Sequence, residues 1–360
     1  AFEAGIAEAK AEIDAIVANQ EEPTFENTIE AMEYAGETLN RVASVFYNLM
    51  EANTNDEMQQ IAEQISPMLN EYSMYVSLNA DLFAKVKSVY EKKDELGLEK
   101  DQLKLLEDNY KSFVRGGANL SDEDKELYSK WSEELSLASL QFSKNVLAAT
   151  NAYTLHITDS ADLAGLPEFV KTMAAETASE KGLEGWAFTL DAPSYSPFLK
   201  YSEVRNLRKD MWTAFNTRAI GGEFDNTDVV KKIVDLRIRI ANILGYETYA
   251  DYALEERMAK DKATVNGFIK ELLDPSMEFA KKDVADVYAF AKKNGFEDSQ
   301  LMPWDFSYWS EKYQQAEYSL SAEELKPYFQ LESCIDAVFG LASRLYGISF
   351  EERKDLPVYH

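Results

Sequence analysis

The residues able to perform hydrolytic or metal chemistry are few in this chain and stand far apart. The sequence contains two histidines, His156 and His360, and a single cysteine, Cys334. A zinc site needs three or four His, Cys or carboxylate side chains that converge on the metal. None of the three residues stands four positions from another, the spacing that places two ligands on one face of a helix. These residues therefore argue against a zinc site and against a Ser-His-Asp or Cys-His arrangement.

His156 lies on the polar, threonine-flanked face of a predicted strand. It has two interpretations: a general base or ligand, or a histidine exposed to solvent. The adjacent residues supply no carboxylate that would orient the imidazole ring for catalysis. We favour the exposed histidine. His360 is the last residue of the sequence, so its surroundings cannot be inferred.

Arginines offer a second kind of chemistry, the binding of an anion. Arg205, Arg208 and Arg218 could hold an anionic group such as a peptide carboxylate, or form surface salt bridges in a protein rich in acidic residues; we favour the salt bridges. Arg237 stands where an apolar stripe should continue. It is interpreted as structural, either buried beside a carboxylate or snorkelling from the apolar face. Arg115-Gly116-Gly117 is too short to indicate a phosphate loop.

An aromatic segment follows residue 302, where residues 303–309 contain four aromatic side chains among seven positions. Aromatic rings with polar tips suit a groove that binds peptides. The same density suits an ordinary contact between two helices. We favour the helix contact on these residues alone.

The composition sets the class of protein. The 360 residues carry 37 basic and 64 acidic side chains, for a net charge of −27, which argues against binding to nucleic acids or anionic membranes. No apolar stretch approaches the roughly 20 residues of a membrane helix. Only 15 glycines and 9 prolines are present, as is typical of helical proteins. The single cysteine favours the cytoplasm, with the periplasm after removal of an export signal as the alternative.

The hydrophobic period predicts a mainly α protein with one small β excursion. Residues 1–151 are expected to form an all-helical region, in which Thr24 is a predicted N-cap although Asn27 replaces the usual Glu. Residues 152–201 form a short β/α excursion, with strands predicted around Leu155 and over residues 185–190 and a helix over residues 166–179. Residues 202–360 are again expected to be helical.

Several segments, taken in order along the chain, resemble the thimet oligopeptidase-like zinc peptidases, and most of all the bacterial peptidyl-dipeptidase Dcp branch. Each segment is moderately specific, and their conjunction spans essentially the whole sequence. The segments are residues 23–29, 40–49, 186–198, 237–260, 303–308, 326–329 and 357–360.

The resemblance implies a helical clam-shell of two lobes around a deep channel, and zinc-dependent cleavage of short peptides, with release of C-terminal dipeptides in the Dcp branch. Its chemistry comes from H-E-x-x-H and a further glutamate. This sequence contains no H-E-x-x-H. No catalytic residue and no metal ligand can therefore be carried over, and zinc is expected only in a full-length parent. What carries over is scaffold and one possible wall of the substrate channel, made of Trp304, Asp305, Tyr308 and Trp309.

Two hypotheses remain from the sequence. In the first, the chain is the N-terminal portion of a peptidyl-dipeptidase or oligopeptidase, inactive alone, with short peptides and a missing C-terminal catalytic lobe as its partners. In the second, it is a stand-alone helical module that binds peptides or other partners without catalysis. Both ends look cut, so a lobe separated from its partner is expected to expose apolar surface and to self-associate.

Overall fold

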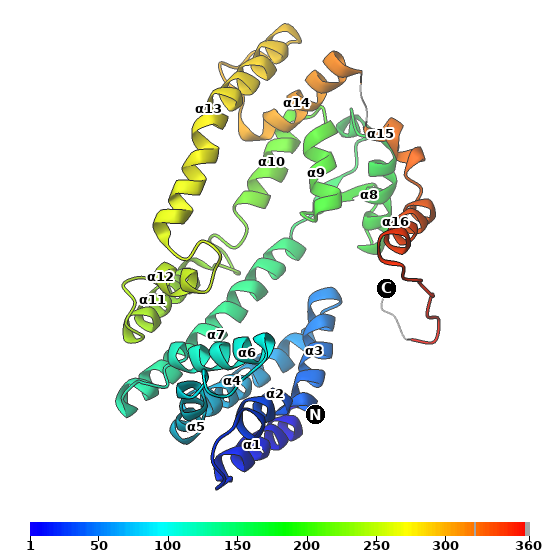
Figure 1. The fold of residues 1–360 in the computed structure, drawn as a ribbon. Helices are drawn as coiled ribbons and strands as arrows, with labels where there is room; N and C mark the ends of the chain where they lie inside the picture. The colour runs from blue at the N-terminus through cyan, green and yellow to red at the C-terminus, as the bar shows by residue number, and fades with distance from the viewer. Residues whose placement is uncertain (320–321, 357–360) are drawn as a thin grey trace. The chain divides into compact units, whose positions relative to one another are not determined.

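The computed structural model describes residues 1–319 and 322–356, and these are mainly helical with one small two-stranded sheet, as predicted (Figure 1). The chain forms two compact units, and each is built from two separate stretches of sequence. Unit 1 comprises Ala1–Ala148 with Ala219–Lys270, and unit 2 comprises Ala149–Arg218 with Glu271–His360. The sequence analysis instead expects three consecutive regions, 1–151, 152–201 and 202–360. This division by order along the chain stays a prediction.

Unit 1 contains helices and no strand in the residues described. Its first stretch runs through seven α-helices and one π-helix, and its second adds two more helices and the start of α13. The elements are α1 (Phe2–Ala18), η1 (Phe25–Glu30), α2 (Ala31–Tyr34), α3 (Glu37–Ala52), α4 (Asp56–Ser77), α5 (Ala80–Glu91), α6 (Lys100–Arg115), α7 (Asp122–Ala152), α11 (Thr227–Ile243), α12 (Tyr249–Glu255) and α13 (Lys262–Lys293). The helices α7 and α13 continue into unit 2.

The core of unit 1 lies where α1, η1, α5 and α6 meet. Burial of these apolar side chains supplies most of the free energy that holds the four elements together. The buried residues are Ile13, Ile16, Phe25, Ile29, Leu82, Phe83, Val86, Val89, Leu106, Phe113 and Ala118. A smaller cluster of Ile6, Ala9 and Leu39 joins α1 to α3.

Thr24 begins η1 as the sequence predicted, and Asn27 replaces Glu in the capping box. The Asn27 backbone N–H donates to Thr24 Oγ1 at 3.1 Å, and the Thr24 backbone N–H donates to Asn27 Oδ1 at 2.8 Å. The amide oxygen of asparagine thus accepts the hydrogen bond that a glutamate usually accepts here.

Arg115, at the end of α6, ties the two stretches of unit 1 together. Its guanidinium donates to the Tyr252 carbonyl at 2.8 Å and to Tyr246 Oη at 3.2 Å, and it pairs with Glu255. It also lies 4.4 Å from the centre of the Tyr252 ring. These partners stand more than 130 positions away from Arg115, so no local pattern in the sequence indicates the contacts.

Unit 2 contains the sheet and a second set of helices. Its first stretch follows the predicted order of strand, helix, strand and helices, and its second ends on α16. The elements are β1 (Leu155–Ile157), η2 (Ser160–Leu163), α8 (Glu168–Glu180), β2 (Trp186–Phe188), α9 (Ala192–Tyr201), α10 (Arg205–Asn216), the rest of α13, α14 (Pro303–Tyr318), α15 (Ala322–Leu325), η3 (Lys326–Tyr328) and α16 (Leu331–Tyr346). No helix within the described residues is long and apolar enough to cross a membrane.

The core of unit 2 covers one face of the sheet with α8, α9 and α10. The strands β1 and β2 pair antiparallel, with Leu155 opposite Phe188 and Ile157 opposite Trp186. This register turns apolar side chains inward and leaves His156 outward, as the period of two predicts. The buried residues are Ile157, Leu163, Leu166, Val170, Ala174, Phe188, Leu190, Phe198, Leu199 and Met211.

Gly185, just before β2, adopts a backbone conformation that a side chain cannot share. Its φ is +89°, and a Cβ atom built there would lie 2.4 Å from the Ile157 carbonyl oxygen of the paired strand. Gly182, in the same connection, also has a positive φ, +69°, but a Cβ atom there meets nothing within 4 Å. Substitution of each glycine in turn therefore distinguishes the cost of backbone strain from the cost of a steric clash.

We expect Gly185→Ala to reduce the free energy of unfolding of unit 2 by about 3 kcal/mol. The cost of the left-handed backbone and the cost of the clash with the Ile157 carbonyl oxygen add to each other. Gly182→Ala should cost about 1 kcal/mol or less, from the left-handed backbone alone. Urea unfolding followed by tryptophan fluorescence measures both, because Trp186, Trp212, Trp304 and Trp309 lie in unit 2 and only Trp131 lies in unit 1. Equal unfolding midpoints for the two variants would contradict the clash.

Candidate functional site

The candidate site of unit 2 is organised by one buried carboxylate at the start of α14. Pro303 occupies the first helical position, where a missing N–H costs nothing, and Asp305 the third. One carboxylate oxygen of Asp305 accepts a hydrogen bond from the Met302 backbone N–H at 3.1 Å. The side chain therefore caps the helix, where negative charge also interacts favourably with the helix dipole.

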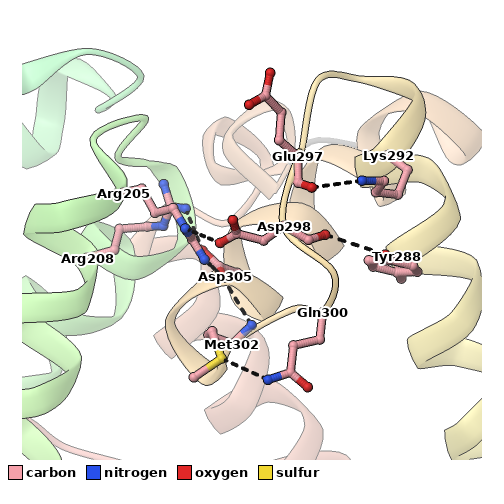
Figure 2. A network of polar contacts seen from close by, with 9 residues as sticks. All are labelled: Arg205, Arg208, Tyr288, Lys292, Glu297, Asp298, Gln300, Met302 and Asp305. Carbon is pink, nitrogen blue, oxygen red and sulfur yellow. Dashed lines mark hydrogen bonds and ion pairs between the residues drawn. The ribbon is translucent and has the colours of Figure 1, made fainter.

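Two arginines from the first turn and a half of α10 hold the same carboxylate, as Figure 2 shows. Arg205 donates from Nε to one oxygen at 2.8 Å and from an Nη to the other at 2.7 Å, which is a bidentate contact. Arg208 donates to Asp305 Oδ1 at 3.2 Å. With the Met302 N–H, the carboxylate accepts four hydrogen bonds, so nothing in its coordination is left to water.

Arg208 is itself buried, with only 2% of its side chain exposed. Its Nε and its other Nη donate to main-chain oxygens, those of Trp304 at 3.0 Å and Ser202 at 2.8 Å. Its guanidinium lies 4.2 Å from the centre of the Tyr308 ring, within range of a cation–π contact. The interpretation of Arg208 as a surface salt bridge is thus wrong: this arginine forms a buried ion pair, because α14 supplies both a carboxylate and an aromatic face.

The pKa of Asp305 reflects two opposing effects. Complete burial by itself disfavours the charged carboxylate and raises the pKa, but the hydrogen bonds from Arg205 and from the Met302 N–H, with the charge of Arg205, outweigh it. The net pKa of Asp305 lies below its ordinary value. Hydrogen bonding to Asp305 correspondingly raises the pKa of Arg205. Both groups are therefore charged at neutral pH.

The connection between α13 and α14, residues 294–302, is fastened over this network (Figure 2). Tyr288 Oη donates to the Ser299 carbonyl at 3.0 Å, and Lys292 Nζ donates to the Glu297 carbonyl at 3.0 Å. Asp298 pairs with the second Nη of Arg205 at 2.5 Å. Both arms of the Arg205 guanidinium are thereby occupied, one by a buried and one by a half-exposed carboxylate.

A pocket of about 350 Å³ opens beside this connection. Its lining combines three carboxylates, two arginines and three aromatic rings: Glu203, Glu297, Asp298, Arg205, Arg208, Phe296, Tyr308 and Trp309, with Gly295. Arg205 and Arg208 are already bonded to Asp305, Asp298 pairs with Arg205, and Glu203 pairs with Lys312. The groups left to a ligand are therefore chiefly the Glu297 carboxylate and the ring faces. Such a surface can accept N–H groups and pack against apolar side chains.

The four residues expected at the channel wall fall in two places. Tyr308 and Trp309 line the pocket, and their rings contact each other edge to face at 5.1 Å between centroids. Trp304 is outside the lining and packs on Trp212 at 5.6 Å. Asp305 has no exposed surface and lies behind the pocket in the arginine network. The wall function of the four stays a prediction.

The other residues singled out in the sequence do not converge on this pocket. His156 is exposed as expected, and its Nε2 lies 2.6 Å from the Glu184 carbonyl oxygen. Arg218 donates to the Phe215 carbonyl at 2.9 Å. Arg237 is exposed with its guanidinium over the Tyr249 ring, so the snorkelling alternative holds rather than the buried ion pair. His360 lies outside the described residues.

The described residues do not fit a zinc ion. Over residues 1–319 and 322–356, no three His, Cys, Asp or Glu side chains are grouped so that they could hold a metal. In the candidate site, the carboxylates of Asp298 and Asp305 are both engaged by Arg205. Neither has the convergent, unpaired oxygens that a metal requires.

Comparison with known proteins relates the chain to peptidases over its full length. The family model described as peptidase family M3 matches residues 198–360. The chain is 35% identical to dipeptidyl carboxypeptidase of Escherichia coli, and this match covers 100% of the chain and 53% of that relative. It is 34% identical to oligopeptidase A of Salmonella typhimurium, over 99% of the chain and 53% of the relative. Saccharolysin of Saccharomyces cerevisiae is 26% identical, over 93% and 47% respectively.

The chain therefore spans about half the length of the curated relatives it matches. The resemblance predicted from the ordered segments is confirmed. The comparisons do not assign a function to any residue of the Asp305 network.

We expect Asp305→Asn to reduce the free energy of unfolding of unit 2 by about 3–5 kcal/mol, because it leaves the buried Arg208 without its counter-charge. The matched control is Asp298→Asn, whose side chain is 53% exposed and also pairs with Arg205. It should cost about 1 kcal/mol or less. Tryptophan fluorescence during urea unfolding measures both, and similar losses for the two variants would contradict a central place for Asp305.

Proposed function

We propose that this chain, whose residues 198–360 match the model of peptidase family M3, is the N-terminal portion of a zinc-dependent peptidase that cleaves short peptides. One observation carries the proposal: all of the chain matches dipeptidyl carboxypeptidase at 35% identity, yet it spans only 53% of that relative. A match that covers all of this chain but only half of the relative is expected if the chain is one part of a larger enzyme.

The proposal divides the work between the chain and the rest of the parent. The sequence holds no H-E-x-x-H, and its described residues do not fit zinc, so the metal and the catalytic groups belong to the remaining part. Zinc, when bound there, supplies an activated water for hydrolysis. The residues of this chain contribute binding surface and position. Peptides enter the proposal because two relatives bear the names dipeptidyl carboxypeptidase and oligopeptidase A. The cytoplasm is the proposed location.

The test compares the chain 1–360 with the longer polypeptide that is encoded by the complete open reading frame containing it. The longer polypeptide should bind zinc, hydrolyse short peptides and lose activity when a chelator removes the metal. The chain 1–360 should neither bind zinc nor hydrolyse peptides. Metal content by mass spectrometry and product analysis by chromatography measure both properties.

Stoichiometric zinc and released dipeptides from 1–360 alone would contradict the proposed division. Tight peptide binding by 1–360, together with no hydrolysis by the longer polypeptide, would favour the stand-alone binding module instead.

We further propose that the pocket beside the Asp305 network contributes one wall of the peptide channel. Trp309 and Tyr308 present ring surface there, next to a carboxylate that can accept hydrogen bonds from a peptide. Tyr308 is held by Arg208 on one face, and Trp309 packs edge to face on Phe296 at 6.0 Å. The wall is thus rigid, and a rigid aromatic surface binds a flexible peptide at low entropic cost.

Trp309→Ala in the longer polypeptide should raise the KM for short peptides by about tenfold with little change in kcat, because the lost contact is made equally in the ground and transition states. Trp304→Ala is the matched control: it makes the same change on the same helix but lies outside the pocket lining. Steady-state kinetics on variants with wild-type circular dichroism decide the matter. An equal KM for both variants would remove Trp309 from the channel.

A further inference from the structure

The last helix described, α16, is amphipathic, and its apolar side has no partner. At 100° per residue, one half of the helix carries all its large apolar side chains, and the opposite half carries Glu332, Ser333, Asp336, Gly340 and Arg344. The stripe Leu331, Ile335, Val338, Ala342 and Leu345 follows the spacing of a helix that packs against another element. This pattern predicts a buried face.

The structure leaves that face open. No residue of α16 is buried, and both Val338 and Leu345 have more than 60% of their surface exposed. No other element of the described chain makes extensive contact with α16. The segment after it is similar: Phe350 stacks on Phe339 at 4.3 Å between ring centroids, yet both rings remain over 40% exposed. We call this surface the α16 face; its exposed members are Leu331, Ile335, Val338, Phe339, Leu341, Leu345 and Tyr346.

The α16 face differs from the apolar face of α8, another helix of unit 2. The helix α8 is also amphipathic, and its Val170, Ala174 and Ala178 are buried against β2 and α9. The sequence of α16 has the same amphipathic pattern, but its apolar side is not buried in the structure. Large exposed apolar patches mark surfaces that another chain or segment covers.

Charge narrows what could cover the α16 face. A membrane-surface helix needs Lys and Arg around its apolar face, and α16 carries one arginine against two acidic residues. A second copy would bring together two chains that each carry a net charge of −27, which opposes association. A covalently attached segment needs no such encounter, because its effective concentration beside the helix is in the millimolar range.

We propose that the α16 face is the docking surface for the C-terminal portion of the parent polypeptide, through an apolar surface of that portion. The inference rests on the proposed function, because the relatives continue for about as many residues again as this chain matches. α16 is the last helix of the described chain (Figure 1), and in the proposed parent the C-terminal portion comes after residues 347–360. The helix then acts as the join between this chain and the part that holds the metal.

The experiment places the same charge on opposite sides of α16 in two polypeptides, the chain 1–360 and the longer polypeptide encoded by the complete open reading frame. Val338→Asp puts a carboxylate in the middle of the apolar stripe. Gly340→Asp is the matched control on the opposite side, where a Cβ atom meets nothing within 4 Å. In 1–360 both positions are exposed, so both variants should melt within about 1 °C of the parent sequence.

In the longer polypeptide, Val338→Asp should lower the melting temperature by about 5 °C or more, or prevent folding altogether, while Gly340→Asp leaves it unchanged. An unchanged melting temperature for Val338→Asp there would overturn the proposal. So would a dimer of the longer polypeptide, detected by sedimentation velocity, that Val338→Asp converts to monomer, because a second copy would then cover the α16 face.

The outcomes separate this inference from the proposed function. A longer polypeptide that folds but neither binds zinc nor cleaves peptides contradicts the function, and the melting comparison still decides the α16 face. An active longer polypeptide indifferent to Val338→Asp contradicts the face alone. An open reading frame that ends at His360 would contradict both the proposed function and the proposed occupant of the α16 face.

Discussion

A carboxylate with no exposed surface can stay charged only where fixed donors replace the water it has lost, and Asp305 meets this condition through four hydrogen bonds. Those donors come from two helices nearly a hundred positions apart. The consequence is geometric: α10 and α14 must keep their relative position, since any shift would expose or orphan a charge. The Tyr308 ring over Arg208, and the pocket beside it, inherit their rigidity from this one constraint.

Local order in this protein is readable from sequence because its causes are local. Thr24 and Asn27 stand three positions apart and close a capping box on each other, and the alternation around Leu155 places the strand correctly. Hydrophobic period also finds the helices. Each of these signals lies within a few residues of the structure it predicts.

The polar network could not be predicted in the same way. A three-residue spacing puts Arg205 and Arg208 on one face of α10, but nothing near them indicates that their partner is Asp305. The expected surface pairing of Arg208 fails because burial is a property of tertiary contacts. Pro303 and Asp305 occupy the first and third positions of α14, and a helix cap and a buried ion pair use the same residue type. Long-range pairs of this kind need either a structure or many related sequences.

The interleaving of the two units affects how the protein is made. Arg115 is synthesised with the first stretch of unit 1, but its partners Tyr246, Tyr252 and Glu255 emerge 131 to 140 residues later. At about 5–20 residues per second, the ribosome delivers them roughly 7 to 28 s afterwards. During that interval the first stretch of unit 2 has already been released. Each unit is therefore completed only after synthesis of the other has begun, although both apolar cores lie within the first stretches and can form before the second stretches emerge.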